Sequence, residues 1–362
     1  MDFLQQFHME DAKTFVYLYR CIITLLVVVL GFTYKKYLNR KINIFYGYIL
    51  CVAISLYWAF RPIDTHYGLG DTKGYAWMFS IVSGGGDLEF KDVGFDFLIK
   101  HIPGTEVWLF FLVMAAIYNV GYLEAARRLT PVRFGVMFML VVCSFSFTGY
   151  GLNGIRNGAA AALMMVGLSS QRIRYTALFA LLAISLHKSL LLPVAAYVVS
   201  IFYNKPKPLL AFWIICFVLS FFAAGFLADA IPWNKIMGDD RAVGYLNSTF
   251  EENDATFSHT GYRFDFIVYS FVPIYIAYKA ITDGIVKSKL YIRLFTVYII
   301  CNAFWLFTIY IPYNNRFAYL SWFIYPYLIG IPFLTDGKWC TTNNIHLLIF
   351  LNFSFTLIMW LI

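Results

Sequence analysis

An arginine and two asparagines stand where a Gly-rich stretch of this sequence passes into a helical, apolar one. Asn153, Arg156 and Asn157 are spaced i, i+3 and i+4, so we expect one shared face at the start of a helix over 152–169. A helix N-terminus carries a positive pole and free N–H groups. The set therefore indicates a site for an anion such as diphosphate, and the plainer alternative is an arginine reaching to the membrane interface.

A histidine and a lysine stand side by side between two short apolar stretches. His187 and Lys188 follow the stretch 175–187, which as a helix is on the order of 20 Å long. The imidazole could then lie below the lipid headgroups, where it takes a proton from a hydroxyl or, protonated, neutralises a phosphate. The alternative is a core histidine bonded to a backbone carbonyl.

Two more arginines precede apolar helices. Arg316 and Tyr319 are three residues apart in a short polar link and repeat the spacing around Arg156. Arg263 opens the stretch 264–281, with Asp265 two residues later. We expect Arg316 and Arg263 to bind an anion, although Asp265 is also a ready salt-bridge partner for Arg263.

A mixed polar cluster follows the second apolar stretch. It contains Arg61, Asp71 and Tyr75, and it forms another candidate for substrate binding. Asp87-Leu88-Glu89 resembles a DxD metal site, but surface acids in a loop are the better interpretation. No His, Asp and Glu set stands at ligand spacing on a common helix, so we expect neither a metal ion nor a cofactor.

The composition shows which elements must position these groups. Of 362 residues, 60% are apolar, 20% aromatic and 13% charged. An ordinary soluble domain is about 45–50% apolar and about 25% charged. A soluble protein is therefore excluded, and an all-α polytopic membrane protein remains. The net charge of +8 falls in short clusters between apolar segments, which argues against nucleic-acid binding.

Apolar segments long enough to enter a bilayer recur along the whole chain. We expect twelve membrane-spanning helices, at 14–33, 42–60, 105–126, 134–150, 152–169, 175–187, 189–203, 209–228, 264–281, 290–311, 318–334 and 345–362. With the N-terminus outside, the inner connectors hold most Lys and Arg and few acids, as the positive-inside rule requires.

The segment 175–203 is too long for one span and short for two. Its flanks are both basic, with Arg172 and Arg174 before it and Lys205 and Lys207 after it. We therefore expect a short helical hairpin with its apex at His187-Lys188, and both chain termini outside. The chain is expected to form one transmembrane domain, 1–362, whose long outer loops, about 61–104 and 229–262, carry function or a small fold.

Three short motifs together resemble a known family. They are Gly154-Ile155-Arg156-Asn157-Gly158-Ala159, Ala183-Ile184-Ser185-Leu186-His187-Lys188-Ser189 and Asn315-Arg316-Phe317-Ala318-Tyr319. They are similar to EpsG-like membrane proteins, which are Wzy-type polymerases of bacterial exopolysaccharide, capsule and O-antigen. Asp71 and Tyr75 fit that family's early Asp-x-x-x-Tyr, whereas Asn157 stands where the family usually has Gln.

The resemblance implies a glycosyltransferase with a fold resembling the GT-C enzymes. It implies polymerisation of undecaprenyl-diphosphate-linked oligosaccharide, as donor and acceptor, at the periplasmic face of the bacterial inner membrane without metal or nucleotide. Membrane lipid and a chain-length regulator protein are the further partners considered.

Such a reaction needs positive charge on the departing diphosphate and a group that accepts the hydroxyl proton. We assign Arg156 and Arg316 to the diphosphate, with Arg263 third, and His187 or else Asp71 as base. Asn153, Asn157, Lys188, Arg61, Tyr75 and Tyr319 complete the expected substrate-binding set. The rival functions are a flippase of lipid-linked oligosaccharide, which usually shows repeats and midplane polar groups, and an O-antigen ligase with the same chemistry.

Overall fold

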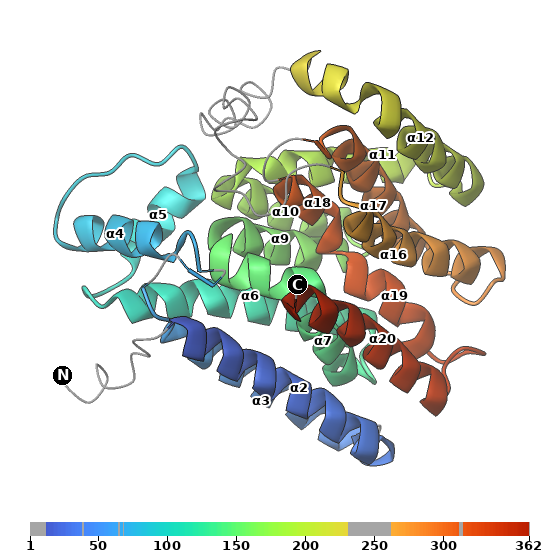
Figure 1. Cartoon of the computed structure of the whole chain (residues 1–362), viewed down its shortest axis with the longest axis horizontal. Coiled ribbons are helices and arrows are strands. Elements are labelled where there is room, and N and C mark those ends of the chain that lie inside the picture. The colour runs from blue at the N-terminus through green and yellow to red at the C-terminus, as the bar shows by residue number, and fades with distance from the viewer. Residues whose placement is uncertain are drawn as a thin grey trace. The chain divides into compact units, whose positions relative to one another are not determined.

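The computed structural model describes residues 12–37, 40–63, 66–67, 69–230, 262–310 and 314–361. Over these ranges the regular structure is helical throughout, and no strand occurs in them (Figure 1). The expectation of an all-α protein is therefore confirmed for the described chain. The second long loop, 229–262, lies almost entirely outside the described residues.

The chain divides into two compact units, 1–187 with 330–362 and 188–329. The helices of the first unit are α2 Ala12–Tyr37, α3 Arg40–Ala59, α4 Thr72–Ser83, α5 Val93–His101, α6 Val107–Leu129, α7 Phe134–Val142, α8 Phe145–Thr148, the π-helix η1 Gly149–Asn153, α9 Ile155–Leu168, α10 Ile173–Leu186 and α20 Thr342–Leu361. Those of the second are the 3-10 helix η2 Lys188–Leu190, α11 Leu191–Phe202, α12 Pro206–Ala230, α16 Phe264–Thr282, α17 Lys289–Phe307 and α18 Asn315–Trp322. Helix α19, Tyr325–Leu334, crosses the boundary. The expectation of one transmembrane domain stays a prediction.

Helices coincide with all twelve segments predicted to enter the membrane. In the described residues six are long and apolar enough to cross it alone: Ala12–Leu30, Val107–Leu129, Phe264–Thr282, Lys289–Phe307, Asn315–Leu334 and Thr342–Leu361. Five shorter apolar helices are Asn43–Ala59, Ile155–Leu168, Ile173–Leu186, Lys188–Phe202 and Pro206–Phe222. The polytopic, helical character is thus supported, while twelve spans and a GT-C-like fold stay predictions.

The segment predicted as one membrane-spanning helix over 134–150 is broken in the structure. The chain breaks after α7, and the segment Ser146–Asn153 leaves at 82° to it. Ser144 adopts an extended backbone conformation at the break, and its hydroxyl turns back to donate to the carbonyl of Leu140 at 2.8 Å. The chain then forms the π-helix η1, a rare element that is frequent at functional sites.

Glycine is required within this π-helix because an aromatic ring lies directly against its backbone. A Cβ atom at Gly151 would come within 1.9 Å of the ring of Trp58, which is fully buried at the end of α3. No side chain larger than hydrogen fits there without moving the indole ring. The tight contact therefore fixes η1 against α3.

Helix α9 is covered by close helix neighbours on its small-residue face. Ala159 to Ala162 are fully buried, and a Cβ atom at Gly121 of α6 would lie 2.9 Å from that of Ala162. Near the C-terminal end of α9, the hydroxyl of Thr176 of α10 donates a hydrogen bond to the carbonyl of Gly167 at 2.9 Å. The small side chains of this run thus let the neighbouring helices approach closely.

The first long loop, expected to carry function or a small fold, contains the two helices α4 and α5. Its helices α4 and α5 contact each other, and they lie beside one end of α6 (Figure 1). Phe79 and Phe95, one from each helix, are fully buried against Phe110 of α6, with ring centroids 5.4 and 6.3 Å away. This aromatic packing anchors the loop to the helices.

The second unit has a core in which uncharged polar side chains join the helices. Asn302 of α17 accepts from the indole of Trp213 at 2.8 Å and donates to Ser321 at 3.1 Å. Trp322 donates to the hydroxyl of Ser270 at 2.7 Å. The helix middles are therefore less uniformly apolar than the sequence pattern suggests, and these bonds satisfy the buried groups.

Candidate functional site

Arg156 lies in the first turn of α9, held from one side by an acid. Its Nη1 is 3.1 Å from Oδ2 of Asp92, and its guanidinium lies over the ring of Phe95 at 5.2 Å. Its Nε is buried and has no hydrogen-bond partner. Gly154, the N-cap, has no side chain that could cap the first N–H groups of α9. This guanidinium combines a fixed orientation with spare donor capacity.

Asn153 is not on the helix with Arg156, contrary to the sequence expectation. It is the last residue of η1, and Gly154 separates it from α9. Its Oδ1 accepts a hydrogen bond from the backbone N–H of Asp71 at 2.7 Å. The asparagine thereby joins the start of α4 to the start of α9.

Arg61 is fully buried beside η1, at 0% exposure. Its Nε donates to the carbonyl of Trp58 at 2.7 Å, and its Nη1 to Leu152 at 2.9 Å and Gly151 at 3.3 Å. The ring of Phe111 lies 4.6 Å from the guanidinium carbon. Burial lowers the pKa of Arg61 to about 9, so the side chain still carries its charge at neutral pH. Through these hydrogen bonds the arginine side chain joins the end of α3 to the π-helix η1.

Asp71 and Tyr75 lie one helical turn apart at the start of α4. Asp71 occupies the N-cap without a side-chain capping bond, and its carbonyl accepts from the N–H of Tyr75 at 3.1 Å. The ring of Tyr75 packs edge-on against Phe95 at 6.1 Å. Both residues are half-buried. Phe95 is thus a shared neighbour of Tyr75 and Arg156.

His187 is the C-cap of α10 and ends that helix where the sequence predicted a break. Its backbone turns extended, with φ −157°, and its N–H donates to the carbonyl of Ala183 at 3.0 Å. The start of α5 packs on the same helix end, since a Cβ atom at Gly94 would lie 2.3 Å from Oγ of Ser185. Helix α5 therefore links the end of α10, next to His187, with Arg156. The hairpin topology itself stays a prediction.

The first unit therefore brings most of the expected site to one end of its helices. The ends of α3 and α10 meet the starts of α4, α5 and α9 there, through the contacts given above. The predicted residues in this cluster are Arg61, Asp71, Tyr75, Asn153, Arg156, Asn157 and His187. Half-buried Asn157 is the next residue of α9 after Arg156.

Sequence reasoning missed Asp92 and Phe95. Asp92 is the N-cap of α5, and the residue is only 7% exposed. The available signal was an aspartate directly before an apolar, helix-forming run in the acidic first loop. That signal marks a helix start, but it does not reveal a partner 64 positions away.

The other predicted residues belong to the second unit. Lys188 is exposed and begins η2, while Arg316 and Tyr319 are half-buried in the first turns of α18. Arg263 is the N-cap of α16, as expected. Its Nε donates to Oδ1 of Asp265 at 2.9 Å, and its Nη2 bonds the other carboxylate oxygen.

The acids at 87 and 89 behave as surface groups in the described structure. The Asp87 side chain is 84% exposed and lies 3.5 Å from Lys100. Among the described residues, no three His, Cys, Asp or Glu side chains group so that they could hold a metal ion.

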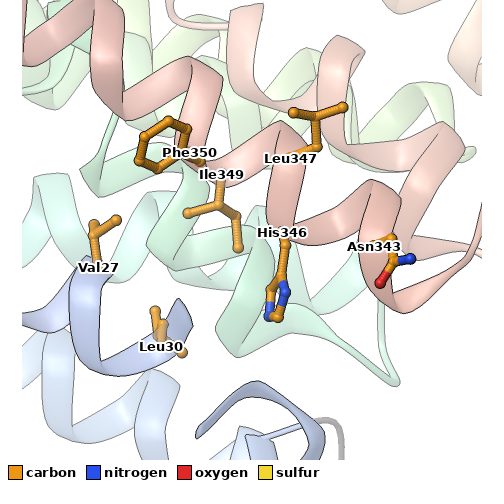
Figure 2. A pocket seen from close by; sticks show the side chains of 7 residues that line it. All are labelled: Val27, Leu30, Asn343, His346, Leu347, Ile349 and Phe350. Carbon is orange, nitrogen blue, oxygen red and sulfur yellow. The ribbon is translucent and has the colours of Figure 1, made fainter. Parts of the chain in front are cut away.

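A groove between α2 and α20 is separate from this cluster. It encloses about 390 Å³, and Figure 2 shows the side chains that line it: Val27, Leu30, Asn343, His346, Leu347, Ile349 and Phe350. None of the predicted site residues contributes to it. The groove therefore adds nothing to the site at Arg156.

Together, the apolar helices of the described residues define the class: a helical membrane protein. The sequence model of the EpsG family matches residues 62–362, so the chain belongs to the EpsG family. The resemblance in the sequence motifs is thereby confirmed. Comparison with curated proteins and with solved structures gives no match. Family membership indicates a polysaccharide-polymerase type of function.

Proposed function

We propose that the protein is a polysaccharide polymerase. It transfers a growing glycan from undecaprenyl diphosphate to the non-reducing end of a second lipid-linked repeat unit. One observation carries the proposal: Arg156 is oriented by Asp92 and Phe95 yet keeps a buried Nε donor without a partner. A buried donor of this kind favours an acceptor group that arrives with the substrate.

The leaving group of this transfer is a diphosphate, which gains negative charge as the sugar departs. Arg156 offers charge-assisted donors, and the uncapped start of α9 adds backbone N–H groups nearby. Such preorganised donors stabilise developing charge at little reorganisation cost. In our proposal they bind the diphosphate more tightly as the glycosidic bond breaks.

The acceptor hydroxyl must lose its proton as its oxygen bonds the anomeric carbon. His187 is our first candidate for the base, because it ends α10 beside the docking point of α5. Asp71 is the second, because Asn153 holds its backbone next to the start of α9. In either case the proton passes to the base while the diphosphate takes the bonding electron pair.

Arg316 and Tyr319 of the second unit are proposed as further diphosphate-binding residues, with Lys188, Asn157 and Tyr75 as lesser contributors. Arg263 ranks below Arg316, because Asp265 occupies both edges of its fork. The reaction is placed at the periplasmic face of the bacterial inner membrane, on the strength of the positive-inside pattern. A chain-length regulator protein remains a proposed partner.

Deleting the gene and sizing the surface polysaccharide tests the proposal against its rivals. A polymerase leaves glycans that carry a single repeat unit. A flippase leaves no surface product and a lipid intermediate retained on the cytoplasmic side. A ligase leaves full-length polymer that is not attached to its acceptor. Either of the last two outcomes would overturn the proposal.

A further inference from the structure

Asp92 occupies the N-cap position, where the side chain of an aspartate usually hydrogen-bonds the first N–H groups of the helix, but its carboxylate is engaged elsewhere. As the N-cap of α5 it makes no side-chain capping bond. A capping aspartate typically stabilises a helix by about 1 kcal/mol. Here the carboxylate is paired with Arg156, and the two side chains are only 8% and 17% exposed.

The guanidinium of Arg156 is held by two groups from the same short helix. Asp92 contacts Nη1 at 3.1 Å, and Phe95, three residues later, presents its ring 5.2 Å from the guanidinium carbon. Residues three apart share a helix face, so Asp92 and Phe95 both contact the guanidinium of Arg156 from the same face of α5. The side chain has therefore lost much of its rotational freedom before any ligand arrives.

Helix α5 is itself fixed by its close contact with α10. A Cβ atom at Gly94 would fall 2.3 Å from Oγ and 2.9 Å from the carbonyl carbon of Ser185. Glycine thus permits a contact that any larger residue would prevent. Through this contact the position of α10 determines where Asp92 holds the arginine.

The contact at Nη1 decides which donors remain. Guanidinium has five N–H donors in a rigid plane. With Nη1 directed at Asp92, the buried Nε is left without a partner. We propose that Asp92 is a positioning residue, which orients Arg156 so that its Nε edge faces the diphosphate of the lipid-linked substrate. This inference rests on the proposed function.

The experiment measures binding of undecaprenyl diphosphate to the purified full-length protein in detergent, with undecaprenol as the uncharged control. The variants are Asp92→Ala, which removes the contact, and Asp92→Asn, which keeps an oxygen acceptor for Nη1 without the charge. Asp87→Asn, an exposed acid of the same loop, is the matched control. Thermal unfolding of each variant reports its folding separately.

A positioning role predicts that Asp92→Ala weakens binding about tenfold or more, by analogy with the loss seen when a group that orients a metal-ligating side chain is removed. Asp92→Asn should keep most of the affinity, and Asp87→Asn all of it. In an Arg156→Ala background, Asp92→Ala should cause no further loss, because its effect acts through the arginine.

Whether the affinity for undecaprenyl diphosphate falls or rises distinguishes a positioning role of Asp92 from simple charge repulsion by its carboxylate. If Asp92 only opposes an incoming anion, both substitutions will tighten binding, and the inference is overturned. Unchanged binding in folded Asp92→Ala would also overturn it. If the alanine variant does not fold, tighter binding in Asp92→Asn is the outcome that overturns the inference. Unchanged binding in Arg156→Ala alone would instead contradict the proposed function.

Discussion

Two arginines at helix starts, one in each unit, make a useful comparison. Arg263 pairs through both edges of its fork with Asp265, which lies two residues away, and its guanidinium lies 3.9 Å above the ring of Phe266. Arg156 contacts a carboxylate through Nη1, and that carboxylate comes from a distant helix. From the sequence alone, both are equivalent candidates for anion binding, because both are arginines at a helix N-terminus.

The difference lies in the donors that remain for a ligand. Arg263 has its Nε and Nη2 engaged by a neighbour in sequence, so an incoming phosphate must displace a carboxylate from both. Arg156 retains an unpartnered Nε inside a partly buried site. Charge at a helix end therefore identifies a candidate, and the unfilled hydrogen-bonding capacity ranks it.

The largest effect is expected at Arg156. Arg156→Ala should abolish polymer extension, and Arg156→Lys should shorten the polymer severely because lysine lacks the planar fork. Losing one charge-assisted hydrogen bond costs roughly 1.5–3 kcal/mol, or about 10- to 150-fold in rate if it forms mainly in the transition state. Gel sizing of the polysaccharide at matched protein levels is the measurement. Near-normal chain length in the alanine variant would show that this arginine only anchors α9.

A third arginine, Arg61, sharpens the comparison because its Nη2 is also buried without a partner, while its other donors bond backbone carbonyls. Arg61→Lys should lower the free energy of unfolding by about 2–4 kcal/mol, since the buried carbonyls of Gly151 and Leu152 lose their donor. Activity should fall together with thermal stability in detergent. Arg127→Lys, at an exposed pair with Glu124, is the control and should change little. Full stability with lost activity would instead support direct substrate contact by Arg61.

At Arg263 we expect a small effect. Arg263→Ala removes a partly exposed local pair, so stability should change by about 1 kcal/mol or less. Polymer length should stay within about threefold of normal, because the fork is already occupied by Asp265. A loss as deep as that of Arg156→Ala would break the comparison and show that substrate displaces Asp265.

The smallest effect is expected from chelation. Purified protein acting on lipid-linked units should keep its rate in excess EDTA, because positive charge at the site is supplied by arginine. Product length with and without EDTA is the measurement. Loss of activity that Mg²⁺ or Mn²⁺ restores would contradict this, and would return attention to Asp87 and Glu89.

Features determined by local sequence were the ones that could be predicted. The start of α16, the helix break at His187 and the pairing of Arg263 with Asp265 all depend on residues within one or two turns. The close approach of α6 at Ala162 followed from an uninterrupted run of small residues. Hydrophobic periodicity and side-chain size are sufficient for such features.

Features determined by distant contacts could not be predicted. The 82° bend lies within an apolar stretch that the sequence pattern predicts as one continuous helix. Ser144, at the break, gives no signal in the sequence that the helix ends there. Arg61 was predicted to bind substrate, and nothing in the sequence indicates that it is fully buried against η1. Likewise, nothing near Asp92 in sequence points to Arg156.

The shortness of helix α10 has a consequence for the surrounding bilayer. Helix α10 has 14 residues, which gives a length of about 21 Å, against roughly 30 Å of hydrocarbon. Leu178 and Leu181 on this helix are exposed, so in a bilayer the hydrophobic mismatch along α10 draws the surrounding lipid headgroups inward. Under the proposed function, this thinning would let a carrier lipid present its diphosphate without being lifted out of the leaflet.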